Sequence, residues 1–228
     1  MKKKIVLIVI VLILIILIAI ASVYVYRYNL LKNIGNAGID FTESDNFYFE
    51  VIPSSNEEEN NSNSHQQLYV KGDKSARYSL TNNTITQRFY IDTQNNTMTV
   101  VDEQNKSYSI VNTETIVGNK GLSNLPEIFN YATSMVSNEY DFKSILGILS
   151  SLHNISTEKE DNTEYIKISL EEKENNYNET VWLNKETLLP VKVEIGNNVR
   201  NYVFEKDNVT DEDVNFSENN YTLVESNN

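Results

Sequence analysis

The first hydrophobic stretch of the chain, Ile5 to Tyr26, constrains everything that follows. Seventeen unbroken apolar residues, Ile5 through Ala21, come directly after Met1 and three lysines. A helix needs about 20 apolar residues to cross the hydrocarbon core of a membrane, and this segment supplies them. Lys2, Lys3 and Lys4 outnumber the cations that follow the run, which predicts a cytoplasmic N-terminus and a C-terminal part outside the cytoplasm.

A cleaved signal peptide is the rival interpretation of the same stretch. Ala19-Ile20-Ala21 before Ser22 fits the small-residue pattern of a cleavage site. The apolar run is longer than a usual signal core and continues past that site, which favours an uncleaved anchor. We therefore expect a single-pass protein of the cell membrane, or a secreted protein if cleavage occurs at Ala21. Both interpretations export the rest of the chain.

Composition narrows what the exported part can be. The 228-residue chain has no cysteine, so it contains neither a disulfide nor a lipid-modified cysteine. From residue 28 onward it keeps 15 of the 19 basic residues and all 32 acidic ones, a net charge of −17. Such a surface repels nucleic acid, so we expect no nucleic-acid partner.

Hydrophobic periodicity predicts strands, then two helices, then more strands. Apolar residues alternate in short runs separated by polar turns at 46–52, 67–72, 75–80, 86–92, 97–101 and 107–111. Helical spacing follows at 125–136 and, with Asp141 as a cap, from Phe142 to Leu152. Strand patterns return at 164–170, 178–183, 189–195 and 199–204. We expect an α+β fold in which one curved, half-open antiparallel sheet packs on at least two helices.

This pattern divides the chain into four parts. Residues 1–27 form the anchor, and 28–45 form a juxtamembrane connector with a short helix that Gly35 or Gly38 would end. Residues 46–214 form the exported domain, and 215–228 a loose acidic tail. Ser123 or Asn124 is the expected cap of the first domain helix, and 54–64 is an expected polar loop.

Three stretches of the chain carry a further signal: Leu68–Lys74 running on to Arg77, then Phe89–Asp92 followed by Met98–Asp102, and finally Val181–Val193 followed by Tyr202–Phe204. Together they resemble the LolA-like fold family of envelope lipoprotein carriers and its Gram-positive relatives. The third, with its Trp-Leu-Asn-Lys-Glu-Thr turn and Leu-Pro-Val, is the most specific. The resemblance implies a half-open sheet around apolar helices, whose concave face holds acyl chains in carrier members. Other relatives are germination lipoproteins that partner a cortex-lytic amidase.

No catalytic constellation is visible in the sequence. The two histidines, His65 in the polar loop and His153 after the second helix, are expected to be separate surface residues. Ser156 to Lys159 matches Ser-x-x-Lys by letter but leads into a strand rather than starting a helix, and Asp211-Glu212-Asp213 lacks the spaced ligands of a calcium loop. We expect no enzyme, no catalytic residue, no metal site and no cofactor, and the sequence singles out no ligand-binding residue.

Two functions remain open at this point. The first is a membrane-anchored, non-enzymatic domain that docks another envelope protein through its sheet. The second is a module that binds a lipid, an acyl chain or a lipoprotein in an apolar cavity between sheet and helices. The two hypotheses predict different surroundings for residues such as Phe142, Ile145 and Leu149. These residues pack against the strands under the first hypothesis and line an open cavity under the second.

Overall fold

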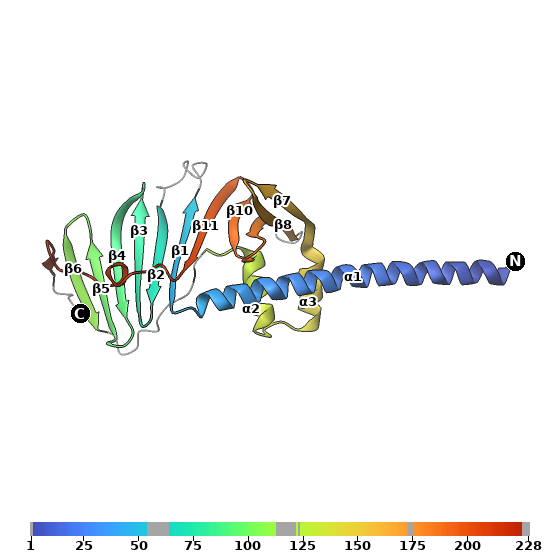
Figure 1. Ribbon diagram of the computed structural model, residues 1–228, viewed down its shortest axis with the longest axis horizontal. Helices are drawn as coiled ribbons and strands as arrows, with labels where there is room; N and C mark the ends of the chain where they lie inside the picture. Colours follow the sequence, from blue (N-terminus) through green and yellow to red (C-terminus); the bar gives the residue numbers. More distant parts are fainter. Residues whose placement is uncertain (1, 54–63, 113–121, 123, 173–175, 225–228) are drawn as a thin grey trace.

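One continuous helix forms the N-terminal part of the protein. The structure, a computed structural model, describes residues 2–53, 64–112, 122, 124–172 and 176–224. Helix α1 runs unbroken from Lys2–Thr42, and its last third lies against the sheet (Figure 1). Residues 28–42 of the expected connector, 28–45, are therefore part of the same helix as the apolar run. The connection between the apolar run and the domain is rigid, because Leu30, Leu31 and Ile34 of this helix are buried in the domain core.

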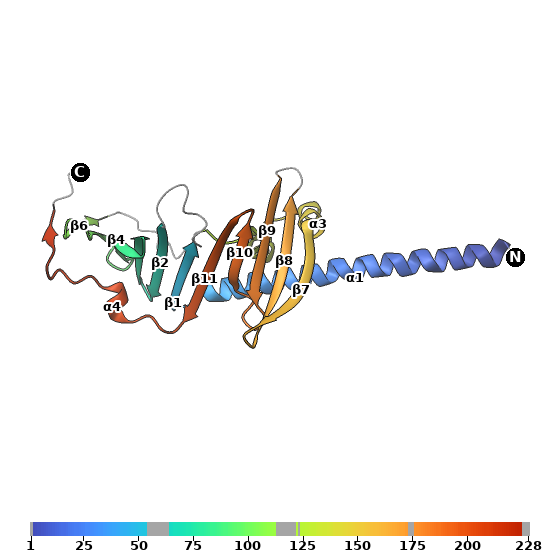
Figure 2. The same ribbon diagram turned by 90° about the horizontal axis from the view of Figure 1, so that it is seen from above.

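A twelve-stranded sheet makes up most of the domain. The strand order is β12-β6-β5-β4-β3-β2-β1-β11-β10-β9-β8-β7, and all neighbours are antiparallel except β12, which runs parallel to β6. The expected fold class is confirmed: the sheet is open, curved and backed by helices (Figures 1 and 2). The strands are β1 Asn46–Pro53, β2 Ser64–Lys71, β3 Lys74–Thr81, β4 Thr84–Asp92, β5 Thr97–Asp102, β6 Ser107–Asn112, β7 Leu152–Glu160, β8 Thr163–Glu172, β9 Tyr177–Asn184, β10 Pro190–Ile195, β11 Asn198–Lys206 and β12 Thr222–Leu223.

The two sides of the sheet carry different cores because side chains alternate along each strand. We call the side that carries Phe47, Phe49 and Leu68 the helix side, since these residues join the main core beneath the helices. The opposite, outer side carries a second cluster that includes Tyr78 and Tyr90. The strand register puts Tyr69 opposite Ala76 and Leu68 opposite Arg77, so the two clusters lie on opposite sides of one layer.

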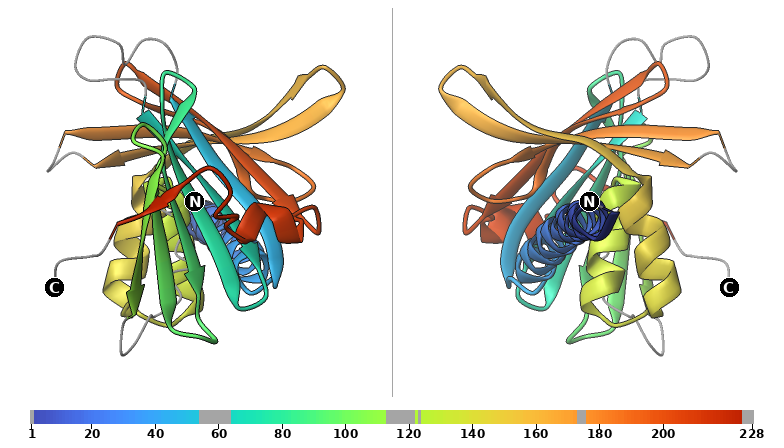
Figure 3. Two further views of the ribbon diagram at one scale, coloured as in Figure 1. Left: turned by 90° about the vertical axis from the view of Figure 1, so that its left-hand side faces the viewer. Right: turned by 90° about the vertical axis from the view of Figure 1, so that its right-hand side faces the viewer.

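Two short helices complete the helix side: α2 Glu127–Val136 and α3 Phe142–Ser151 (Figure 3). Asp141 caps α3 as expected, with its Oδ1 accepting a hydrogen bond from the Ser144 backbone N–H at 2.7 Å. The expected cap of α2 is wrong for Asn124, and Ser123 lies outside the described residues. Glu179 of β9 caps α2 instead, because its carboxylate accepts hydrogen bonds from the backbone N–H groups of Glu127 and Ile128.

The two glycines of α1 do not end it. A Cβ atom on Gly35 would lie 2.2 Å from the Ala132 carbonyl oxygen, and one on Gly38 would lie 2.5 Å from the Phe129 ring. Both positions therefore allow α1 and α2 to approach at backbone distance. The predicted helix end at these residues is wrong, because packing on α2 outweighs the weak helix propensity of glycine.

The C-terminal segment follows the outer side of the sheet. After α4 Asp211–Val214, the ring of Phe216 packs on Tyr108 at 4.9 Å between centroids and on Tyr90 at 5.7 Å. Strand β12 then pairs with β6. Residues 215–224, expected to be loose, thus cover the second core, and the remainder of the expected tail lies outside the described residues.

Candidate functional site

Helix α1 occupies the concave helix side of the sheet. Leu31, Ile34 and Phe41 are at most 1% exposed and pack with α2 and the strands in the main core. The helix that carries the apolar N-terminal run therefore also fills the space that the resemblance assigned to an acyl chain. A ligand could therefore bind beside α1, but not at the centre of the concave side of the sheet.

The apolar residues of α3 differ in how far they are buried. Leu149 of α3 is buried and Ile145 packs partly against the core, so this region is closed. Phe142 is 76% exposed and Leu146 is 39% exposed. The expected apolar stripe of α3 is therefore wrong at these two positions, which face solvent in the isolated chain.

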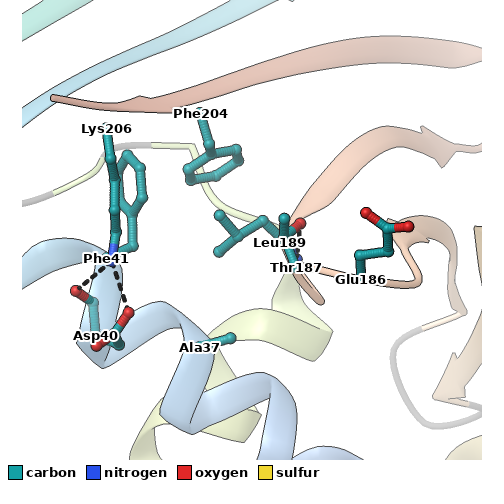
Figure 4. A pocket seen from close by; sticks show the side chains of 8 residues that line it. All are labelled: Ala37, Asp40, Phe41, Glu186, Thr187, Leu189, Phe204 and Lys206. Carbon is teal, nitrogen blue, oxygen red and sulfur yellow. Dashed lines mark hydrogen bonds and ion pairs between the residues drawn. The ribbon is translucent and has the colours of Figure 1, made fainter. Parts of the chain in front are cut away.

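An open cavity lies beside α1, which we call the α1 groove (Figure 4). Its volume is about 450 Å³, within the roughly 300–1,000 Å³ of typical ligand pockets. The C-terminal part of α1, the β9–β10 turn and strand β11 form its walls. Its lining residues are Ala37, Asp40, Phe41, Glu186, Thr187, Leu189, Phe204 and Lys206.

The floor of the α1 groove is apolar and its rim is charged. The rings of Phe41 and Phe204 meet edge to face at 5.0 Å between centroids. At the rim, Lys206 Nζ donates to Asp40 Oδ2 at 2.6 Å and to the Asp40 carbonyl oxygen at 3.1 Å (Figure 4). Because Asp40 already neutralises Lys206, the groove suits an apolar chain better than an anion.

The turn that closes one end of the groove is ordered by Asn184. Its Oδ1 accepts hydrogen bonds from the backbone N–H groups of Glu186 and Thr187, at 2.9 and 3.1 Å. Leu188 has a positive φ of 58° and donates its N–H to the Asn184 carbonyl oxygen at 2.8 Å. The Asn-Lys-Glu-Thr sequence thus fixes the groove wall locally, although only the fold brings it beside α1.

A second surface lies on the helix side beyond the end of α1. The register places Phe89 opposite Val100, and Ile91, Met98 and Val111 in one row across β4, β5 and β6. All five are half-buried, and these strands extend past the last turn of α1 (Figure 1). We call these five residues the distal sheet patch.

Trp182, the only tryptophan, lies on the outer side of the sheet. Its ring is held between two cations, with Lys192 Nζ at 4.4 Å and Lys167 Nζ at 4.7 Å from the ring centroid. Its indole N–H donates to Glu158 at 3.0 Å. The ring borders a cavity of about 240 Å³. Its indole N–H and both of its faces are already engaged by Glu158 and the two lysines.

The polar residues singled out in the sequence are not brought together. His65 is buried on β2, with Nε2 3.2 Å from Glu50 Oε1, so its expected place on a surface loop is wrong. His153 lies 3.6 Å from Glu171 at the other end of the sheet. Asp211 forms an ion pair with the Lys71 ammonium, its Oδ1 lying 2.9 Å from Lys71 Nζ. Within the described part of the chain, no group of three or more His, Cys, Asp or Glu side chains could hold a metal ion.

Comparison with known proteins gives similar folds only. No family model and no curated protein matches the sequence. Similar solved structures include the MucA/MucB complex of Pseudomonas aeruginosa, with 11% identity over 84% of this chain and 61% of that one and a TM-score of 0.44. LprF from Mycobacterium bovis has 10% identity over 81% and 95%, with a TM-score of 0.43. The Mycobacterium tuberculosis lipoprotein LppX has 15% identity over 80% and 97%, with a TM-score of 0.40.

Proposed function

We propose that this protein is a membrane-tethered, non-enzymatic domain outside the cytoplasm that docks another protein of the cell envelope. One observation carries the proposal: the same helix supplies the apolar run and the centre of the domain core. Among the described residues, α1 is the one helix long and apolar enough to cross a membrane, and its apolar run is exposed rather than buried. A domain whose core contains its own membrane anchor suits a protein that stays attached to the membrane better than a carrier that must leave it.

The distal sheet patch is the docking surface in this proposal. It combines five apolar side chains on neighbouring strands, and it lies at the end of the domain farthest from the apolar run of α1 (Figure 1). Apolar residues that share one sheet face form the kind of patch that protein partners cover. A tethered domain would present this end to proteins that lie beyond the membrane surface.

Site-specific photo-crosslinking in cells tests the docking surface. A crosslinker at Val100 should give a protein adduct, whereas one at Ile110 should give none. Ile110 is the matched control because it is 43% exposed on the adjacent strand but faces the outer side. Equal adducts from both positions, or none from Val100, would contradict the docking role of the patch.

Binding of a lipid or acyl chain is the second candidate function, favoured by the α1 groove. Its volume and its Phe41, Phe204 and Leu189 lining suit an apolar chain. Native mass spectrometry of the full chain released from membranes should then show a bound lipid. Ala37→Trp, which fills the groove, should abolish that adduct, while Asn36→Trp on the neighbouring exposed position should keep it. If the released chain carries no lipid adduct, lipid binding is contradicted and docking is the one proposed function that remains.

A further inference from the structure

Two apolar side chains on α3 are exposed on the surface of the domain. Phe142 is 76% exposed and Leu146 is 39% exposed, and their spacing of four residues puts them on one flank of the helix. In the described residues outside α1, the other large apolar side chains with such exposure are Ile110, Leu223 and Val224, on β6 and the C-terminal segment at the opposite end. The flank of α3 is therefore a separate apolar surface.

Helix α3 lies at the end of the domain nearest to the apolar run of α1. Arg27 Nη1 donates to the Leu149 carbonyl oxygen at 2.7 Å, and Tyr24 packs partly against the main core. Figure 1 and the right view of Figure 3, which looks along α1 from its N-terminal end, show α3 crossing α1 at this level. If α1 spans a bilayer, α3 thus lies across the membrane normal.

The length of α1 sets the depth of this crossing. From Ile5 to Val25 the helix has 21 residues, which at about 1.5 Å each gives about 32 Å, close to the roughly 30 Å of a hydrocarbon core. Tyr24 and Arg27 then lie at the headgroup level. Because α1 is unbroken, the Arg27–Leu149 contact places α3 at the same level.

From this geometry we propose that α3 lies in the outer headgroup layer of the bilayer that α1 spans, with Phe142 and Leu146 inserted into lipid. The inference rests on the membrane anchoring in the proposed function. Lys143 on α3 is offset by Asp141 at its N-cap, so the contact is apolar rather than electrostatic. A second contact beside the spanning helix would fix the tilt of the domain and the direction in which the distal sheet patch points.

Depth-dependent fluorescence quenching tests this contact in the full chain. The protein has no cysteine, so a single Leu146→Cys variant takes one environment-sensitive NBD label without further changes. In phosphatidylcholine vesicles, we expect blue-shifted emission and strong quenching by a shallow doxyl lipid, with the same result when anionic lipid is added. The matched control is Ile110→Cys, which should report water and show no quenching.

Two further variants separate the possible outcomes. An Ile13→Cys label should be quenched by a deep doxyl lipid if α1 spans the bilayer. Quenching at position 13 with a water-exposed label at 146 would overturn the α3 contact and leave the anchor intact, whereas a water-exposed label at 13 would overturn both. Adding Phe142→Ser to the Leu146→Cys chain should reduce the quenching, and unchanged quenching would also contradict insertion. Because Phe142 is exposed, this substitution leaves the core intact.

Discussion

Glu179 shows how a single buried carboxylate can organise a helix from a distant strand. It is 1% exposed, and its two oxygens accept hydrogen bonds from Ile128 N–H at 3.0 Å, Glu127 N–H at 2.9 Å and the Tyr177 hydroxyl at 2.7 Å. Two of these donors are N–H groups in the first turn of α2, which have no acceptor within the helix. The helix dipole also favours a negative charge at this end. Burial raises the pKa of Glu179, while the three hydrogen bonds oppose that rise.

The first prediction concerns Glu179→Gln. The amide cannot accept all three hydrogen bonds, so we expect a loss of about 1–3 kcal/mol in the free energy of unfolding. Urea unfolding of the full chain in detergent micelles, followed by Trp182 fluorescence, measures this loss. The conservative change of Glu186, an exposed turn residue, to Gln is the control and should change stability little.

The second prediction is the pH dependence of that difference. Because the folded-state pKa of Glu179 lies above its unfolded value, the folded state holds the proton more tightly. The stabilising contribution of this proton is complete below the unfolded pKa and is lost as the pH rises through the folded pKa. The stability advantage of the parent chain over Glu179→Gln should therefore shrink as the pH is raised above the ordinary carboxyl range. An advantage that grows with pH would contradict a raised pKa.

At the scale of elements, the close approach of α1 and α2 depends on glycine. Gly35 leaves no room for a side chain against the Ala132 carbonyl. At Gly147 in α3, by contrast, no described atom beyond the adjacent residues and the helix backbone lies within 4 Å of an added Cβ. The same residue type thus serves packing in one helix and only weakens the other.

The third prediction compares alanine at these two glycines. Gly35→Ala should lower the free energy of unfolding by about 1–3 kcal/mol, because the backbones of α1 and α2 must separate. Gly147→Ala should raise it by about 0.5–1 kcal/mol through better helix propensity. Denaturant midpoints of the two variants measure both effects, and a neutral Gly35→Ala would mean that the two helices can adjust at no cost.

The C-terminal segment is a second element that side-chain contacts hold against the sheet. Phe216 contacts Tyr90, Tyr108 and Tyr221, and β12 adds backbone bonds from Thr222 N–H to Lys106 O and from Val224 N–H to Tyr108 O. A two-residue strand supplies little stability of its own, so the aromatic contacts must hold the segment in place.

The fourth prediction is that Phe216→Ala releases this segment without unfolding the domain. Hydrogen exchange of the Thr222 and Val224 amides should become much faster, while exchange in β1 and β11 should stay slow. Leu223→Ala is the control, because that side chain is 55% exposed and its loss should leave the segment in place. Equal release by both variants would show that the aromatic contacts are not decisive.

At the scale of the whole molecule, one rigid helix joins the apolar run to the domain. Leu30, Leu31 and Ile34 of α1 are core residues only a few positions after Tyr26, so no linker allows the domain to rotate freely. The orientation of the distal sheet patch is therefore coupled to that of α1.

The fifth prediction is that Tyr28→Pro uncouples the two parts. Proline inside a helix removes a backbone hydrogen bond and costs about 3 kcal/mol or more, so we expect a kink between the apolar run and the core. Spin labels at Ile13→Cys and Asn105→Cys should give a narrow distance distribution in the parent background and a broad one in the proline variant. Tyr28→Ala controls for the lost side chain, which is 39% exposed, and should leave the distribution narrow.

The elements that the sequence predicted correctly are those whose signal is local. The apolar run, the α3 cap at Asp141 and the alternating strands follow from the residues within each segment. The turn between β3 and β4 is equally local, because Asn82 and Asn83 both have the positive φ values that asparagine tolerates. The sequence does not predict strand β7, because Leu152–Glu160 shows little apolar alternation and most of its side chains are exposed on an edge strand.

The candidate site could not be predicted from the sequence. Ala37, Leu189 and Phe204 belong to three separate parts of the chain, and no pattern within any of them indicates a cavity. Likewise, the charge pair of Lys206 and Asp40 joins residues 166 positions apart. The sequence predicts a helix end at Gly35 or Gly38 because helix propensity is local, while the packing that overrides it is not.

Local patterns are enough to predict an apolar N-terminal helix followed by an α+β domain with an antiparallel sheet, because the length and period of hydrophobic runs are properties of short segments. That this helix continues into the core and fills the concave side of the sheet cannot be predicted in this way, since it depends on contacts between α1, α2 and distant strands. The same contacts expose Phe142 and Leu146 and leave the α1 groove open. Local patterns allow several arrangements of these elements. The favoured arrangement is the one that buries the most apolar area, which depends on contacts across the whole chain.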